Sequence, residues 1–305
     1  MPSLPLSAVR AGHLDRRSFL AAGAALVVAA ACSSGDDDTT SSGATATTSG
    51  AEPDQLEVLL ASAQLVAGSD QRVTAGVLKD AEPLRQADGV RIAFGRDFKN
   101  LGPWQPATFH HEGIDDRPYY KTSYRFDTAG QWVMAVEAGG KTGASPLNVI
   151  TADSTKVPLV GGAMIPVKTP TVADHAGVDP ICTRDPQCPF HDVSLDAALG
   201  EKRPVAAIFS TPALCQSRVC GPVLDVLVKE ADAFKDHIRF VHVEVYRSMQ
   251  VDFNDPNALA PGMQAYHLTF EPVLFLSGAD GVVRERLDGP YDALECRDAL
   301  GRLAA

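Results

Sequence analysis

The sequence lacks an excess of basic residues: 27 Lys and Arg are outnumbered by 38 Asp and Glu, and the formal net charge is −11. A protein that binds nucleic acid by neutralising phosphates needs the opposite balance, so we expect no nucleic-acid partner. Disordered and fibrous classes are also excluded, since 45% of the 305 residues are apolar and only 21% are charged. The length is sufficient for two domains of about 100–200 residues each.

Long hydrophobic runs are scarce, and the strongest covers only residues 19–31, fewer than the roughly 20 that a helix needs to span a bilayer. Arg16 and Arg17 precede this run and Cys32 ends it, which resembles a twin-arginine export signal followed by the lipobox of a bacterial lipoprotein. The resemblance implies cleavage before Cys32 and a diacylglycerol on its thiol. Ala29 departs from the larger aliphatic residue usual in a lipobox, and cleavage with release is the alternative.

This leader predicts an extracytoplasmic protein that is lipid-anchored to the cell membrane. We assign residues 1–31 to a signal peptide and residues 32–54, rich in Ser, Thr, Gly and Ala, to a flexible tether. An even total of six cysteines would allow three disulfides in an exported protein. Cys32 is assigned to the lipid, however, and Cys296 has no near neighbour to pair with, so we expect it to be a buried free thiol.

Residues 55–150 contain no cysteine, so a domain formed there depends on its apolar core alone. Short apolar alternations separated by turn signals occur at residues 56–60, 72–78, 90–94 and 132–136. They predict an antiparallel β-sandwich, and residues 124–132 resemble the turn into a late strand of immunoglobulin-like modules. His110, His111 and Glu112 are expected in an exposed polar loop. A metal site there is the alternative, although neighbours on a strand face opposite sides.

Residues 151–178 show no sustained periodicity and are punctuated by prolines and glycines, which predicts a linker that wraps. Cys182 and Cys188 follow, with five residues between them. In an oxidising compartment this spacing predicts a structural disulfide. Zinc or copper binding and a second redox pair are the alternatives. Metal binding would need further soft ligands, and the sequence nearby offers only His191.

The order of elements in residues 179–305 is that of an α/β domain. An apolar strand at residues 204–209 precedes Cys215 and Cys220, and a helical pattern follows at residues 223–234. Further elements are expected as strands at 238–245 and 273–276, a hairpin partner at 282–284 and a final helix from residue 291.

This order resembles a thioredoxin-like domain of the extracytoplasmic thiol-disulfide type. The resemblance rests on Cys215 and Cys220 after the first long strand, on residues 221–225, and on Glu271 and Pro272 before the hairpin. It implies that Pro272 is preceded by a cis peptide and faces the active sulfur, and that the backbone of Glu271 pairs with a bound substrate strand. Thioredoxins have two residues between their cysteines, whereas this chain has four.

The unusual spacing allows two registers. Residues 220–223 match the Cys-Gly-Pro-Cys of the family with the second cysteine replaced by Val223. We favour the register in which Cys215 is the nucleophile, because a thiol at a helix start is exposed and its thiolate is stabilised by the helix dipole. On an ideal helix, residues five apart are rotated by about 140°, so the pair closes only if Cys215 precedes regular helix.

The predicted reaction is thiol-disulfide exchange with extracytoplasmic protein thiols or disulfides, without a cofactor: Cys215 attacks and Cys220 resolves the mixed disulfide. A non-catalytic scaffold with a permanent Cys215–Cys220 disulfide is one alternative. A Sco-like copper-handling protein is another, with His242 or His267 as the distant ligand, although that family has three residues between its cysteines. The peroxiredoxin pattern is only partly echoed before Cys215. We assign no metal ligand.

Overall fold

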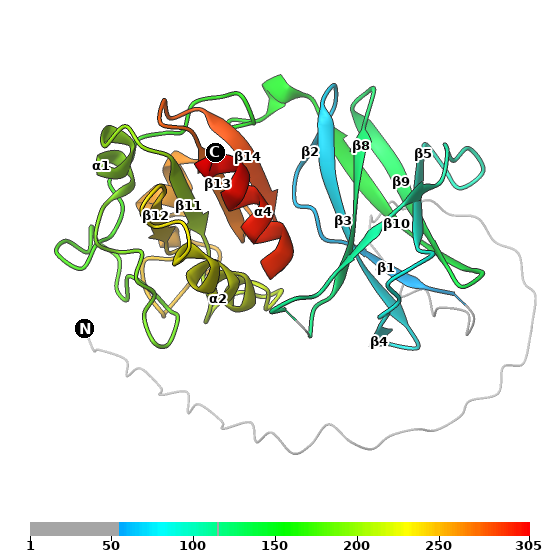
Figure 1. Ribbon diagram of the computed structural model, residues 1–305, viewed down its shortest axis with the longest axis horizontal. Coiled ribbons are helices and arrows are strands. Elements are labelled where there is room, and N and C mark those ends of the chain that lie inside the picture. The colour runs from blue at the N-terminus through cyan, green and yellow to red at the C-terminus, as the bar shows by residue number, and fades with distance from the viewer. Residues whose placement is uncertain (1–54, 115) are drawn as a thin grey trace, which may run out of the picture. The chain divides into compact units, whose positions relative to one another are not determined.

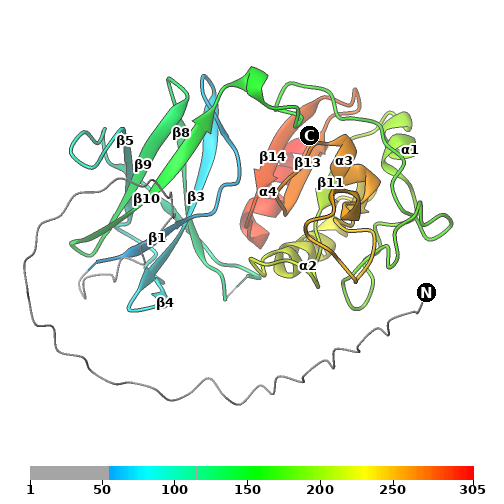
Figure 2. The same ribbon diagram turned by 180° about the vertical axis from the view of Figure 1, so that it is seen from behind.

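The computed structural model describes residues 55–114 and 116–305, so the predicted signal peptide, the tether and the Cys32 lipid site lie outside the described residues. In the described part, an N-terminal β-sandwich is followed by a mixed α/β region (Figures 1 and 2). Both belong to one compact unit. None of the helices in the described ranges is long and apolar enough to cross a membrane.

Two five-stranded sheets form the sandwich. The first sheet contains β1 (Glu57–Leu60), β3 (Asp70–Lys79), β8 (Tyr119–Arg125) and β7 (Thr108–His110) in that order, with β4 (Glu82–Pro83) paired to β3. The second contains, in order, β2 (Leu65–Val66), β10 (Lys141–Ile150), β9 (Gly130–Ala138), β5 (Arg91–Gly95) and β6 (Gln105–Pro106).

The predicted β-sandwich is confirmed, but its description as wholly antiparallel was wrong at one place. In the second sheet, β2 pairs with β10 in parallel. The other strand pairs described in the sandwich are antiparallel. The physical reason is the connection from β1 to β2, in which the chain passes from the first sheet to the second without a reversing hairpin.

Alternation along the strands gives the first sheet two buried faces. Val73 and Val77 of β3 point into the sandwich core, whereas Arg72 points to the opposite side. In β8, Tyr120 belongs to the sandwich core and its neighbour Tyr119 belongs to a core of the α/β region. The first sheet therefore contributes apolar surface to both parts of the chain.

The α/β region is built on a four-stranded sheet. Its order is β12 (Arg239–Val243), β11 (Val205–Phe209), β13 (Val273–Ser277) and β14 (Val283–Asp288). β11 is parallel to β12, and the β11–β13 and β13–β14 pairs are antiparallel. The helices are α1 (Leu195–Gly200), α2 (Cys220–Ala231), α3 (Pro261–Ala265) and α4 (Ala293–Ala304), with 3-10 turns at Ala152–Ser154 and Pro256–Ala258.

The two faces of this sheet carry different helices. Ile208 and Leu274 share a core with residues of α2 and α4, whereas Phe209 and Val273 share one with residues of α1 and α3. All five residues of β11 are buried, as expected for the apolar run that predicted a central strand. The order of strands and helices expected from the sequence is present.

The stretch predicted as a linker, residues 151–178, packs onto the α/β region. Val157 and Met164 are buried in the core that also contains residues of α1 and α3. Ala163 forms an antiparallel bridge with Val282, just before β14. Its apolar side chains therefore extend the α/β core beyond the boundary predicted at residue 179.

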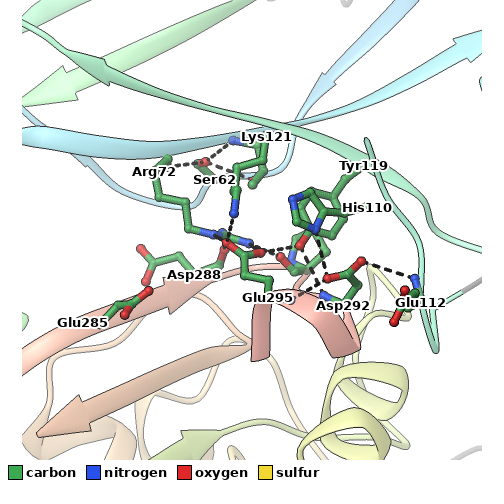
Figure 3. A network of polar contacts seen from close by, with 12 residues as sticks. Ser62, Arg72, His110, Glu112, Tyr119, Lys121, Glu285, Asp288, Asp292 and Glu295 are labelled. Carbon is green, nitrogen blue, oxygen red and sulfur yellow. Dashed lines mark hydrogen bonds and ion pairs between the residues drawn. The ribbon is translucent and has the colours of Figure 1, made fainter. Parts of the chain in front are cut away.

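A buried polar network joins the first sheet to α4 (Figure 3). The Arg72 guanidinium donates to both carboxylate oxygens of Glu295, each at 2.7 Å, and to the backbone carbonyl of Asp288 at 2.8 Å. Glu295 also accepts from the Tyr119 hydroxyl and, at 3.1 Å, from the Lys121 ammonium group. These bonds fix the sandwich against the end of the α/β region.

The prediction that His110 lies in an exposed loop was wrong. His110 is the last residue of β7, is only 3% exposed, and has its Nδ1 2.9 Å from Oδ1 of Asp292, the N-cap of α4. Pairing of β7 with β8 places this histidine against the helix end. His111 and Glu112 are exposed, as expected, and their backbone N–H groups donate to Asp292.

Candidate functional site

Cys215 and Cys220 meet at the start of α2. Cys220 is the first residue of that helix, and Cys215 lies in the turn before it, where its backbone N–H donates to the carbonyl of Thr211 at 3.1 Å. The sulfur atoms of both cysteines and a carboxylate oxygen of Glu271 lie within 4.8 Å of one another. Cys215 thus precedes regular helix, which is the geometry that closing the pair requires.

The two thiols of this pair have opposite properties. The Cys220 thiol donates to Cys215 and lowers the pKa of Cys215 to about 5, although burial opposes this shift. The Ser217 hydroxyl and the backbone N–H groups of Cys220 and Val219 lower the same pKa further. Donation to Cys215 and burial both raise the pKa of Cys220. Cys215 is 8% exposed and Cys220 is fully buried. At neutral pH the outer sulfur is therefore a thiolate and the inner one a thiol.

Glu271 supplies a carboxylate to this pair, a contact that sequence analysis missed because it considered only the backbone of this residue. Burial, followed by the charges of Cys215 and Glu244, raises the pKa of Glu271 to about 7. The Glu271–Pro272 peptide is cis. Arg218, between the two cysteines in sequence, is exposed, and its backbone carbonyl accepts from Arg117.

A cavity of about 360 Å³ lies between this site and the first sheet of the sandwich. Ser217, Val219 and Glu271 line it on the side of the thiols. The opposite side is formed by apolar residues of β1, β3 and β4: Leu59, Leu60, Val77, Leu78 and Pro83. Leu59 is 50% exposed, so the apolar wall opens to solvent beside the cysteine pair.

Cys182 and Cys188 form a second cluster, which includes two histidines. Donor atoms of Cys182, Cys188, His191 and His242 all lie within 4.8 Å of one another. The two cysteines are thiols in this structure, so the disulfide between them stays a prediction. The thiol of Cys188 donates to Cys182 and lowers its pKa, whereas that contact and burial raise the pKa of Cys188.

The remaining candidates from sequence fall in other places. His242, considered as a copper ligand beside Cys215 and Cys220, lies in the other cluster, and His267 is exposed. Within the described ranges, the group around Cys215 contains Glu271 and no histidine. Cys296 is a fully buried thiol, as expected, and burial raises its pKa.

No family model and no curated protein matches this sequence. Among solved structures, titin M4 is similar at 8% identity and a TM-score of 0.19, over 32% of this chain and 98% of the titin chain. Titin M3 is similar at 16% identity and a TM-score of 0.20, over 32% of this chain and 97% of the other.

Proposed function

We propose that this protein exchanges thiols and disulfides with extracytoplasmic proteins through Cys215 and Cys220, carried by a thioredoxin-like domain. The observation that carries the proposal is the placement of the pair: Cys215 is slightly exposed in the turn before α2, and Cys220 is fully buried as the first residue of that helix. Their sulfur atoms lie within 4.8 Å of each other. An accessible sulfur at a helix start with a shielded partner suits a nucleophile and its resolving thiol.

The reaction proceeds in two exchanges. The Cys215 thiolate attacks one sulfur of a client disulfide, so that a Cys215–client bond forms and the second client sulfur leaves as a thiolate. Cys220 then loses its proton and attacks the Cys215 sulfur, which releases the first client sulfur. The client gains two electrons and the pair loses them. The same steps in reverse oxidise a client dithiol.

Glu271 is the proton acceptor for Cys220 in the second exchange. Its carboxylate lies within 4.8 Å of both sulfur atoms, and its pKa of about 7 matches the operating pH of a general base. The buried Cys220 thiol has little access to water that would otherwise take the proton. The pKa of about 7 applies beside the Cys215 thiolate; in the mixed disulfide Cys215 carries no charge, so the pKa of Glu271 is lower there and burial is the main cause that raises it.

The client is a protein segment that carries a disulfide or dithiol. The apolar wall formed by Leu59 and Leu78 beside the pair suits side chains that flank a client cysteine. The twin-arginine and lipobox resemblance supports a location outside the cytoplasm, at the membrane, with a lipid on Cys32 as the anchor. In that location disulfides are available as substrates.

Trapping tests this function. In Cys220→Ser the second exchange cannot occur, so clients should accumulate as mixed disulfides on Cys215 that dithiothreitol releases. Cys215→Ser is the matched control and should trap none, and Cys296→Ser should not alter the yield. Titration against glutathione or dithiothreitol buffers should give the Cys215–Cys220 disulfide a reduction potential above about −300 mV. Equal trapping by Cys220→Ser and Cys215→Ser, or a bridge reducible only far below that potential, would support the scaffold instead.

A further inference from the structure

The cluster of Cys182, Cys188, His191 and His242 combines two sulfur and two nitrogen donors from separate parts of the chain. The first three residues lie in the loop before α1, and His242 lies in β12. All four are buried, with exposed fractions of 7%, 2%, 1% and 0% in that order. We propose that these residues form a zinc site. This proposal does not depend on the proposed function of Cys215 and Cys220.

The spacing of the donor atoms fits a tetrahedral ion. His191 Nε2 and His242 Nδ1 are 3.0 Å apart, and Cys188 Sγ and His242 Nδ1 are 3.4 Å apart. Zinc bonds of about 2.0–2.1 Å to nitrogen and about 2.3 Å to sulfur place tetrahedral neighbours about 3.3 Å apart for two nitrogens and about 3.6 Å apart for nitrogen and sulfur. These two pairs need to separate by only a few tenths of an ångström to hold the ion, and all four donor atoms lie within 4.8 Å of one another.

The ring of His242 is oriented for this role by a backbone carbonyl. Its Nε2 lies 3.0 Å from the oxygen of Ser210, an acceptor only, so Nε2 carries the proton. The lone pair of Nδ1 therefore faces the sulfur atoms and His191. A hydrogen bond from the second ring nitrogen to a carbonyl is the arrangement that fixes metal-binding histidines.

Charge favours an ion rather than a disulfide at this place. Two thiolates and one Zn²⁺ sum to zero, which suits a buried site, and both imidazoles then coordinate. A Cys182–Cys188 disulfide uses neither imidazole. Glu244 holds the loop in place, since its carboxylate accepts from the backbone N–H of Thr183 at 2.8 Å. The two-sulfur, two-nitrogen donor set selects zinc over magnesium or calcium.

The test uses the whole mature chain, reduced under anaerobic conditions, stripped of metal with a chelator and then given Zn²⁺ or Co²⁺ alone. We expect one ion per chain by mass spectrometry of metals. The Co²⁺ form should show the intense visible bands of tetrahedral cobalt with a thiolate charge-transfer band. X-ray absorption of the Zn²⁺ form should give two sulfur and two nitrogen neighbours, a measurement that requires no variant.

Variants locate the ion. His191→Ala and Cys182→Ser should weaken zinc binding by more than about 100-fold, which exceeds the loss from removing a partner of a ligand. The double variant Cys215→Ser with Cys220→Ser should still bind one ion per chain. The proposal is overturned if the reduced chain takes up no ion, if that double variant loses it, or if X-ray absorption finds another donor set. A circular dichroism spectrum establishes that each variant is folded.

Discussion

Arg72 and Glu295, 223 positions apart in the chain, form a two-pronged ion pair in which both side chains are largely buried. Removing one partner of such a pair leaves a buried charge without compensation. We predict that Glu295→Gln lowers the free energy of unfolding by about 3–5 kcal/mol, measured by urea denaturation at pH 7.

The matched control for this change is Arg302→Ala. Arg302 pairs with Glu285 at 2.8 Å but is 59% exposed, so its removal should cost no more than about 1 kcal/mol. Similar losses in the two variants would contradict the importance assigned to the buried pair.

Acid should weaken the same contact. Burial alone would raise the pKa of Glu295, but Arg72 and Lys121 outweigh it and lower the pKa from 4.5 to about 2. A carboxyl with a depressed pKa in the folded state stabilises the protein above its unfolded pKa. The contribution of Glu295 to the free energy of unfolding should therefore decrease as pH falls from about 4.5 to about 2. Midpoints of urea denaturation measured across that pH range test this. In Glu295→Gln the part of the slope due to this carboxyl should be absent.

The reactivity of Cys215 should reveal its thiolate. Iodoacetamide should alkylate reduced wild-type protein at a rate whose pH midpoint is about 5. Cys220→Ala removes the first donor to that thiolate. A hydrogen bond to a charged group contributes about 1.5–3 kcal/mol, so the pKa of Cys215 should rise by about 1–2. An unchanged midpoint would mean that Cys220 does not stabilise the thiolate. Cys296→Ser should leave the midpoint where it is.

Glu271→Gln should affect the second exchange and leave the first intact. In the wild type, resolution of a mixed disulfide on Cys215 should accelerate as Glu271 loses its proton, at a pH below about 7 because Cys215 carries no charge in that intermediate. The variant should lose this pH dependence and should resolve the mixed disulfide about 100-fold more slowly. This is the lower end of the range of rate losses expected when a general base is removed. Stopped-flow measurement of thiol release separates the two steps. Retention of the wild-type pH profile would exclude Glu271 as the proton acceptor.

The apolar wall beside Cys215 and Cys220 should increase the rate of exchange with protein clients and leave exchange with small disulfides unaffected. Leu59→Asp places a charge where a client side chain is expected to bind, so exchange with a disulfide-bonded protein should slow by about tenfold or more. Exchange with oxidised glutathione should be unchanged, because that molecule is too small to need the wall. Phe98→Asp is the control, since Phe98 is 65% exposed and does not line the cavity. Equal slowing with both substrates would indicate damage to the pair itself.

Several features could be predicted from sequence because they depend on neighbours along the chain. Alternating apolar residues placed β3 and β9, and the uninterrupted apolar run at residues 204–209 placed β11. Cys215 and Cys220 are close in sequence, so their approach at the start of α2 followed from helix geometry. The exposed-loop prediction for His110 failed, because its burial depends on Asp292, 182 positions away.

Local pattern was thus sufficient for the two-part architecture and for the position of the cysteine pair. It was not sufficient to predict which side chains contact each cysteine. His242 reaches Cys188 across 54 positions because the backbone N–H of His242, in the edge strand β12, donates to the carbonyl of Phe190. Glu271 reaches the thiols because β13, which follows it, pairs with β11, which precedes Cys215. Contacts between strands and loops far apart in the chain bring such residues together, and a sequence pattern with a period of a few residues contains no information about them.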